Sequence, residues 1–253
     1  MTSTTRFQSM PVTEDNLHLV QVAHDDMKQV SVTSTATSCV SGDSDPFTLY
    51  TIVVTCPSTK LWWIIKKRYS EFYALRQYFR KMQKACKNAS LNKALKPLMD
   101  LSFPKRSFRL DTEAIINERK RAFDAMTAVL MAIRSHCLFT SVQYQDDNNT
   151  ATQLGHVCDV IEAFLCIPDL QKNEEIRRTE IILSSPDVAT TEINYKEHAD
   201  DDCPICLCDF DSDDKVLHLG CGHNFHEGCV MQWIQLKMSC PICRQTSICG
   251  IAK

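Results

Sequence analysis

The first two thirds of the chain carry apolar patterns that predict strands followed by helices. Residues 16–23 alternate between apolar and polar positions with a period of two, which predicts an edge strand. Residues 47–56 and 61–67 are rich in β-branched and aromatic residues and flank a Pro-Ser turn, so they predict a β-hairpin. We therefore expect three strands before the first helix.

Helical periodicity follows the hairpin. Ser70 is a good N-cap, and the apolar residues after it recur at helical spacing on one face. Residues 112–133 repeat this pattern with Arg119 inside the apolar stripe, and residues 153–170 are again amphipathic. These helices are expected to pack on the sheet and to close the domain.

Three segments outside these patterns predict little packed structure. The Ser/Thr-rich start, residues 1–9, is expected to be disordered, and residues 245–253 form a C-terminal tail. Residues 171–202 are polar and acidic at their end, so we expect a linker that is partly helical around EEIRRTEIIL. A flexible linker of this length spans roughly 30 Å and would let the two flanking modules move apart.

From the composition we expect neither a targeting segment nor a membrane-spanning segment. Its start lacks the apolar core of a signal peptide. Its uninterrupted apolar runs fall short of the roughly 18 residues that a bilayer span needs. We expect a soluble intracellular protein.

Charge is unevenly distributed. Residues 47–121 contain 17 Lys and Arg against 5 Asp and Glu, a net charge of +12, whereas the whole chain carries −3. The remaining residues therefore carry −15. A basic module beside an acidic remainder indicates a polyanionic partner for the basic part.

Eight cysteine and histidine residues gather near the C-terminus. They are Cys203, Cys206, Cys221, His223, His226, Cys229, Cys240 and Cys243, separated by 2, 14, 1, 2, 2, 10 and 2 residues. Disulfides, a catalytic thiol with a histidine base, and a structural zinc pair compete as interpretations. A reducing cytosol disfavours disulfides, and no cysteine stands apart as a nucleophile. Two-residue gaps let two thiolates reach one metal about 2.3 Å away, which favours two tetrahedral zinc ions.

Residues 203–244 resemble the RING family in its two-histidine form and match it at all eight ligand positions. The resemblance implies a cross-braced pair of structural Zn²⁺ ions with no open coordination position. The first zinc would be held by Cys203, Cys206, His226 and Cys229, and the second by Cys221, His223, Cys240 and Cys243. The adjacent Cys208 would be a free thiol.

The same resemblance implies ubiquitin-ligase chemistry. In ligases of this family a shallow groove receives the ubiquitin-conjugating enzyme, and here Ile205, Trp233 and Pro241 take the groove positions. Arg244 takes the position of the linchpin, a basic residue that bridges to ubiquitin and holds its thioester ready for attack by a substrate lysine. The alternatives are that Ile205 and Trp233 only pack a small core and that Arg244 is a solvated charge.

Two arginines of the basic module stand where an anion would satisfy them. Arg119 occupies an apolar helix position, where burial is costly without an anion or a carboxylate, and snorkelling to the surface is the alternative. Arg68 ends a strand where the next helix presents its N-terminal amides, and both groups suit phosphate. No motif that reads nucleic acid accompanies the charge, so phosphoinositide is favoured over nucleic acid.

The segments KKRYSEFYALRQYF, SFPKRSF and INERKRAFDAM resemble the phox-homology (PX) family, and the resemblance covers residues 10–170. It implies an α+β fold in which a three-stranded antiparallel sheet packs on a helical subdomain. It also implies that Arg68 clamps the 3-phosphate of phosphatidylinositol 3-phosphate and that Tyr69 stacks under the inositol ring. Lys105 would meet the 1-phosphate, and Arg119 would bind ring hydroxyls.

This chain departs from the PX pattern in one loop. The proline-rich loop of the family is reduced here to residues 93–108, with Pro97 and Pro104. Its apolar residues either form a wedge that enters the bilayer or fold back onto the core. They are Leu98, Met99 and Leu101.

Taken together, the two resemblances predict a cytosolic RING-type E3 ubiquitin ligase that the PX domain brings to endosomal membranes. The partners implied are a ubiquitin-conjugating enzyme, ubiquitin and a peripherally bound phosphoinositide membrane, without nucleic acid. The alternative is a non-catalytic membrane adaptor with a zinc-stabilised tail that binds other proteins.

Overall fold

The computed structural model describes most of the residues between 21 and 252. The residues it describes are 21, 25, 28–39, 46–86, 88–107, 111–143, 148–184, 202–211 and 213–252. The expected disorder of residues 1–9 and the start of the PX domain at residue 10 lie outside these residues.

Three antiparallel strands begin the described fold. Strands β2 (Phe47–Cys56) and β3 (Leu61–Arg68) form the predicted hairpin, with Leu49 opposite Arg68 and Cys56 opposite Leu61. The third strand is β1 (Ser31–Cys39), which pairs with β2 along its whole length. The third strand of the sheet is therefore residues 31–39 and not the predicted strand at 16–23. Only Gln21 of that predicted strand is described, and it is helical.

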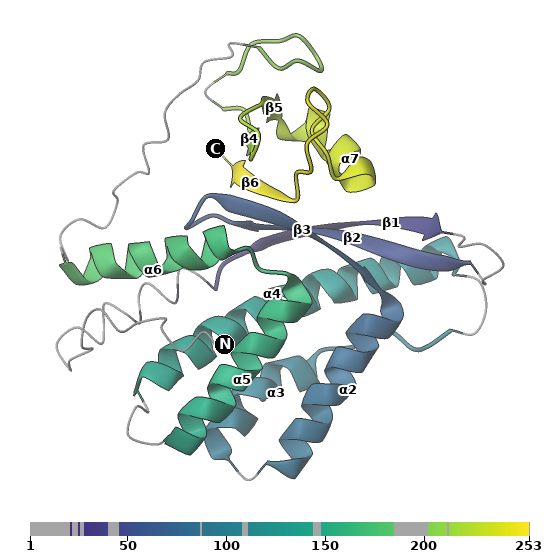
Figure 1. Cartoon of the computed structure of the whole chain (residues 1–253). Helices are drawn as coiled ribbons and strands as arrows, with labels where there is room; N and C mark the ends of the chain where they lie inside the picture. Colours follow the sequence, from purple (N-terminus) through teal and green to yellow (C-terminus); the bar gives the residue numbers. More distant parts are fainter. Residues whose placement is uncertain are drawn as a thin grey trace.

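Four helices cover one face of these strands (Figure 1). They are α2 (Tyr69–Ala85), α3 (Ala89–Asp100), α4 (Glu113–Gln143) and α5 (Asn148–Leu165). Their apolar faces meet Tyr50, Ile52, Trp63 and Ile65 in one continuous core. The predicted α+β arrangement of sheet and helices is confirmed.

Two details of these helices differ from the sequence reading. The N-cap of α2 is Arg68 and not Ser70, because the Glu71 carboxylate accepts a hydrogen bond from the Arg68 backbone N–H at 2.8 Å. Helix α4 contains a stretch, Glu113–Thr140, that is long and apolar enough by composition to cross a membrane. Its Phe123, Met126 and Leu130 lie in the core, as expected of the central helix of a folded domain.

The first half of the expected loop at 93–108 is helical. Helix α3 runs through Pro97, with Asn88 as its N-cap, because the Asn88 side chain accepts from the backbone N–H groups of Ser90 and Leu91. Leu98 is fully buried, and Met99 and Leu101 pack against the main core. The wedge interpretation is therefore wrong, since these side chains have already found an apolar partner inside the protein.

Part of the expected linker also belongs to the folded body. Helix α6 (Asp169–Ser184) occupies its first half, and Gln171, Glu175 and Thr179 are buried. The reason is a buried ion-pair network, in which Arg134 of α4 makes paired hydrogen bonds of 2.9 and 2.8 Å to the Glu175 carboxylate. A third bond joins Arg134 to Glu162 at 2.9 Å. Removing one partner of such a network leaves a buried charge uncompensated, so α6 is anchored there.

The C-terminal region extends the same sheet. Strands β4 (Val216–Leu219), β5 (Asn224–His226) and β6 (Cys249–Ala252) and helix α7 (Glu227–Lys237) form a second, smaller module. Strand β6 lies between β3 and β4, giving one six-stranded sheet of order β1-β2-β3-β6-β4-β5 (Figure 1). Part of the expected C-terminal tail, residues 245–253, is thus a strand that joins the modules, and the zinc module is docked on the PX sheet.

The docking explains why β3 is apolar on both faces. Trp63 and Ile65 point into the main core, where the Trp63 indole N–H donates to the Leu165 carbonyl at 3.1 Å. Trp62 and Ile64 point the other way, into a second apolar cluster with residues of the C-terminal module. A strand covered on both faces needs a continuous apolar run, and the sequence LWWII supplies one.

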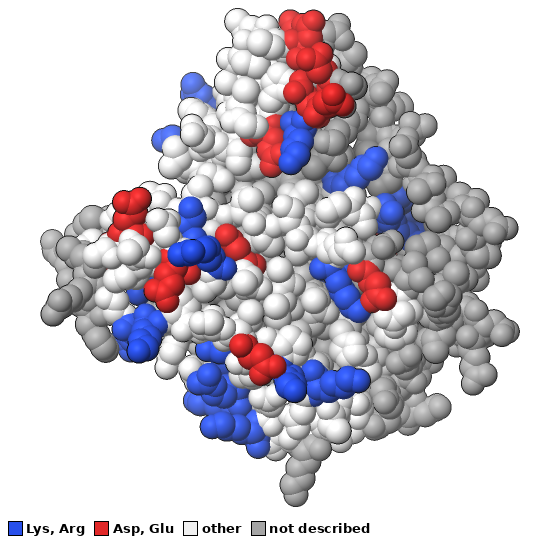
Figure 2. All heavy atoms as spheres, turned by 180° about the vertical axis from the view of Figure 1, so that it is seen from behind, with Lys and Arg blue, Asp and Glu red and all other residues white. Residues whose placement is uncertain are grey.

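Charge follows the division into modules. Lys and Arg side chains gather on the helical lower part of the face in Figure 2, and Asp and Glu crowd the C-terminal module at the top. This agrees with the net +12 of residues 47–121.

Candidate functional site

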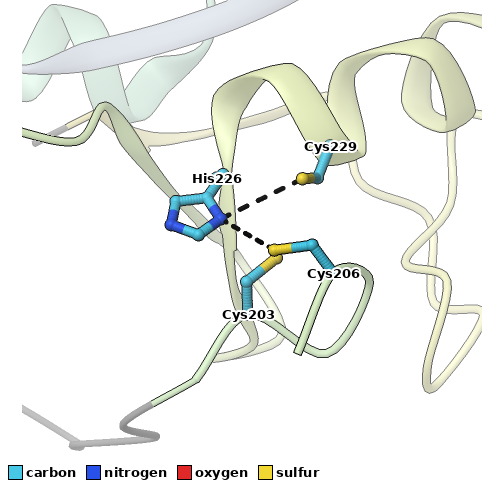
Figure 3. A group of neighbouring side chains, drawn as sticks. All are labelled: Cys203, Cys206, His226 and Cys229. Atoms are coloured by element: carbon cyan, nitrogen blue, oxygen red, sulfur yellow. Dashed lines mark hydrogen bonds between the residues drawn. The ribbon is translucent and has the colours of Figure 1, made fainter. Parts of the chain in front are cut away.

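The first predicted set of zinc ligands converges on one point. The side chains of Cys203, Cys206, His226 and Cys229 face one another (Figure 3), and their ligand atoms all lie within 4.8 Å of each other. His226 Nδ1 is 3.2 Å from Cys206 Sγ and 4.0 Å from Cys229 Sγ. Tetrahedral zinc with ordinary bond lengths separates a sulfur and a nitrogen by about 3.5 Å, so these residues fit the ion.

The second set also converges. Cys221, His223, Cys240 and Cys243 have their ligand atoms within 4.8 Å of one another. His223 Nδ1 is 3.4 Å from Cys221 Sγ and 3.7 Å from Cys240 Sγ. Cys208 belongs to neither set, as expected of a free thiol. The two sets alternate along the chain, so they fit two structural zinc ions in the cross-braced arrangement.

Thiol ionisation supports a metal role for these clusters. Burial raises the pKa of Cys203, but backbone N–H groups of Cys206, His226 and Ile205 overcome it and lower the value to about 6. Burial and neighbouring thiols raise the pKa of Cys221 and Cys229 to about 11. Backbone hydrogen bonds also lower the pKa of Cys206 in the first set and of Cys243 in the second. Each set thus combines thiols that ionise readily with one that resists ionisation, and a bound cation would favour the thiolate form of all of them.

Two matching turns carry the paired cysteines. In the first, the Leu207 N–H donates to the Cys203 carbonyl at 2.8 Å; in the second, the Arg244 N–H donates to the Cys240 carbonyl at 3.0 Å. Leu207 and Arg244 both adopt positive φ, at 60° and 59°. Such αL turns aim consecutive backbone N–H groups and both thiolates at one point, and the repeated sequence Cys-Pro-Ile-Cys encodes them twice.

Sequence reasoning missed a carboxylate behind the first site. Asp214 Oδ2 lies 3.1 Å from Nε2 of His226, on the far side of the imidazole from the thiols. A carboxylate there fixes the ring orientation and strengthens the ligand nitrogen. The acidic run DSDD between the ligand pairs was the available signal.

The predicted groove residues are accessible. Ile205 is 43% exposed in the first turn and Trp233 40% exposed on α7, while Pro241 in the second turn is half-buried and Arg244 is exposed. The alternative that Ile205 and Trp233 fill the small core does not hold, because Phe225, Val230 and Ile234 fill it.

Further apolar residues on this module are exposed that the sequence reading did not single out. They are Leu207, Leu236, Ile242 and Ile248. Ile242 occupies the same place in the second turn as Ile205 in the first, so the repeated motif could have found it. Exposed apolar side chains are typical of protein-binding surfaces where they form a continuous patch, so these residues are candidate contacts for a partner.

The predicted lipid residues meet at the junction of β3, α2 and α4. The Arg119 guanidinium stacks on the Tyr69 ring, with Cζ 4.3 Å from the ring centroid. Arg119 does not snorkel, since it is only 4% exposed. Arg68 is exposed at the end of β3, and its guanidinium lies over the Phe47 ring at 3.3 Å.

Lys105 is held near Tyr69 by a hydrogen bond of the preceding residue, Pro104. The Tyr69 hydroxyl donates to the Pro104 carbonyl at 2.8 Å, which ties the extended segment before the exposed Lys105 to the start of α2. Arg68, Lys105 and Arg119 therefore lie around Tyr69; the first two are exposed, and Arg119 is buried. The buried charge of Arg119 is offset by an ion pair with Asp111, 2.6 Å away, and by the Tyr69 ring that it stacks on.

Comparison with known proteins finds two families. The family model for the ring finger domain matches residues 201–244, and the model for the PX domain matches residues 56–138. The chain therefore contains a RING finger domain and a PX domain. No solved structure matches the chain.

The curated relatives match the RING region alone. The chain is 41% identical over 46 residues, 18% of its length, to E3 ubiquitin-protein ligase RNF181 of Mus musculus. It is 38% identical over 69 residues, 26% of its length, to E3 ubiquitin-protein ligase RNF126 of Homo sapiens. It is 54% identical over 48 residues, 18% of its length, to probable E3 ubiquitin-protein ligase RHA1A of Arabidopsis thaliana. The matches span 28%, 21% and 30% of these relatives.

Proposed function

We propose that this chain, which carries a PX domain and a RING finger domain, is a RING-type ubiquitin ligase that binds membranes containing phosphatidylinositol 3-phosphate. The observation that supports the proposal is that two groups of predicted site residues stand on one continuous sheet. The zinc sites and the exposed apolar residues lie on the side of β3 that pairs with β6, and the basic cluster of Arg68, Lys105 and Arg119 lies around the end of β3. Relatives named as ubiquitin ligases support the first half, and the PX match supports the second.

The zinc module acts by positioning, because both zinc ions have four protein ligands and no open place for water or substrate. Ile205, Trp233 and Pro241 form the contact for a ubiquitin-conjugating enzyme. In the transfer step a lysine amine attacks the carbonyl of the ubiquitin thioester, an amide forms, and the enzyme's cysteine leaves as a thiolate. No nucleophile from this chain is needed.

Arg244 supplies the one polar contribution to that step. It stands directly after the last zinc ligand, exposed and in an αL conformation fixed by the bond of its N–H to the Cys240 carbonyl. There it donates to ubiquitin and holds the thioester in its reactive pose. Because the zinc turn fixes its backbone, only side-chain freedom is lost on binding.

The PX pocket supplies the membrane address. Arg68 offers a planar fork that suits bidentate phosphate binding, next to the N-terminal amides of α2. Lys105 adds an exposed charge for the 1-phosphate, and Tyr69 offers its ring. Since this phosphoinositide marks endosomes, we place the protein peripherally on endosomal membranes, where its substrates are reached by local concentration.

The ligase half is tested by ubiquitin-chain formation with purified protein and a panel of conjugating enzymes. Arg244→Ala is expected to slow transfer about 10- to 100-fold, the rate equivalent of a charged hydrogen bond. Arg121→Ala is the matched control. It removes an exposed arginine from α4, outside the zinc module, and should leave transfer unchanged. No transfer with any enzyme, from protein holding two zinc ions, would favour the non-catalytic adaptor.

The lipid half is tested by liposome binding. Arg68→Ala should abolish binding to liposomes containing phosphatidylinositol 3-phosphate, while Lys84→Ala, an exposed charge at the other end of α2, should change it little. Equal binding by wild type and Arg68→Ala would remove the lipid proposal.

A further inference from the structure

One carboxylate of the chain, that of Asp111, is paired with Arg119 of the basic cluster. Arg119 Nη1 donates to Asp111 Oδ2 at 2.6 Å, and the Thr48 hydroxyl of β2 donates to the same oxygen at 2.7 Å. The side chain of Asp111 is 15% exposed, so the pair is largely shielded from water. The residue expected to bind ring hydroxyls of the lipid is therefore paired with an acid of its own chain.

This pairing fixes the orientation of Arg119 from two sides. Asp111 holds one end of the guanidinium, and the Tyr69 ring covers its face. The Nε atom is buried and has no hydrogen-bond partner among the described residues. The guanidinium is thus held in place, with one buried N–H that donates to no described residue.

An acid beside an arginine discriminates between hydroxyls and phosphates. A ring hydroxyl can accept from Arg119 and donate to the Asp111 carboxylate, so both protein groups are satisfied. A phosphate at the same ring position has no proton to offer, and its charge would lie within a few ångströms of the carboxylate. Like charges at that distance repel strongly in a partly buried site.

We propose that Asp111 is a specificity-determining residue that restricts the lipid to a phosphoinositide with free hydroxyls at the ring positions next to Arg119. The inference rests on the proposed phosphoinositide function and deepens it, because it selects the 3-monophosphate over the 3,4- and 3,5-bisphosphates. Thr48 assists by holding the carboxylate in place on β2.

The test compares three lipids on the full chain. Liposomes of phosphatidylcholine carry phosphatidylinositol 3-phosphate, the 3,4-bisphosphate or the 3,5-bisphosphate, and affinities are measured for wild type, Asp111→Asn and Asp100→Asn. The asparagine retains an acceptor for Thr48 and Arg119 but lacks the charge. Asp100 is exposed at the end of α3. The Asp100→Asn variant removes the same charge from the basic module at a position away from Arg119.

The expected result is a change of preference. Wild type and Asp100→Asn should favour the monophosphate at least about tenfold, and Asp111→Asn should bring a bisphosphate to within about threefold of the monophosphate by strengthening its binding. Asp111→Ser removes the charge as well and gives the same comparison if the asparagine variant melts early.

Three outcomes would overturn the inference. An unchanged preference would mean that Asp111 only neutralises Arg119. An equal gain for all three lipids would make it a general block of the pocket, and a loss of monophosphate binding by a folded variant would make it a structural partner of Arg119. If wild type binds no phosphoinositide at all, the proposed function fails instead.

Discussion

The PX domain and the zinc module share one sheet but are stabilised in different ways. The PX domain buries a large core between its strands and helices, with Trp63, Phe72 and Phe123 at its centre. The zinc module has a few buried apolar residues and takes Trp62 and Ile64 from the PX sheet to complete its cluster. A module this small cannot bury enough apolar surface alone, so metal and a borrowed sheet face replace the missing core.

The contrast separates what zinc fixes from what packing fixes. Zinc holds the ligand turns and therefore the backbone at Ile205 and Arg244. The pairing of β6 with β3, with Gly250 opposite Trp62, fixes how the module sits on the PX domain. Local geometry and orientation thus have independent causes, which makes them separable by experiment.

Metal removal should give the largest difference in stability between the zinc module and the PX domain. A strong chelator removes on the order of 10 kcal/mol per structural zinc, so the zinc module should unfold while the PX domain keeps its core. Ubiquitin transfer should be lost and phosphoinositide binding retained, as measured by transfer and liposome assays on one sample. Transfer that survives loss of both zinc ions would contradict this account.

Replacing each of two neighbouring tryptophans with alanine should show separately what each face of β3 stabilises. Trp62→Ala is expected to cost about 3–5 kcal/mol at the docking cluster and to release the zinc module, with lipid binding kept. Trp63→Ala should cost a similar amount in the PX core and weaken lipid binding. Calorimetry combined with liposome binding distinguishes them, and identical behaviour of the variants would refute the two-sided role of β3.

A single methyl group on β6 should test the docking itself. A Cβ at Gly250 would lie 2.2 Å from the His218 carbonyl oxygen and 2.9 Å from Trp62 Nε1. Gly250→Ala should therefore destabilise the docked state by about 2–3 kcal/mol and expose the C-terminal strand to proteolysis.

Gly228→Ala is the matched control for that change. Gly228 lies in α7 of the same module, and nothing stands within 4 Å of a Cβ there. Alanine in a helix should be neutral or stabilising. Equal protease resistance of the two variants would show that β6 does not hold the modules together.

The smallest expected effect concerns the arginine fork. Arg68→Lys keeps the charge but loses bidentate geometry, so affinity for phosphatidylinositol 3-phosphate should fall about tenfold while a single contact remains. Titration with liposomes measures this, and the zinc content and ubiquitin transfer without membranes should not change. Full affinity in Arg68→Lys would mean that Arg68 acts as a point charge only.

The zinc sites were readable from sequence because ligand spacing is a local property. Cys203 and Cys206, and again Cys240 and Cys243, lie close enough along the chain for one tight turn to bring them together. Asp214 was not identified, since a carboxylate behind a histidine depends on how the intervening segment folds. The hairpin of β2 and β3 was predicted for the same local reason.

The contacts between distant segments were not predicted. Leu98 and Gln171 were assigned to a loop and a linker, because the apolar core and the Arg134 network that bury them form only in three dimensions. The run LWWII did carry a signal: an apolar residue at every position indicates a strand covered on both faces, which a sheet with one solvent face does not need. In the structure the zinc module covers that second face.

The central claim is that one protein joins phosphoinositide binding to ubiquitin transfer, and a reconstituted transfer assay on liposomes tests it most directly. Chain formation is measured with and without phosphatidylinositol 3-phosphate for wild type, Arg68→Ala and Arg244→Ala. The account predicts transfer localised to the lipid-containing liposomes for wild type, undirected transfer for Arg68→Ala, and little transfer for Arg244→Ala. Absence of transfer from protein with two zinc ions, or membrane localisation that survives Arg68→Ala, would contradict it.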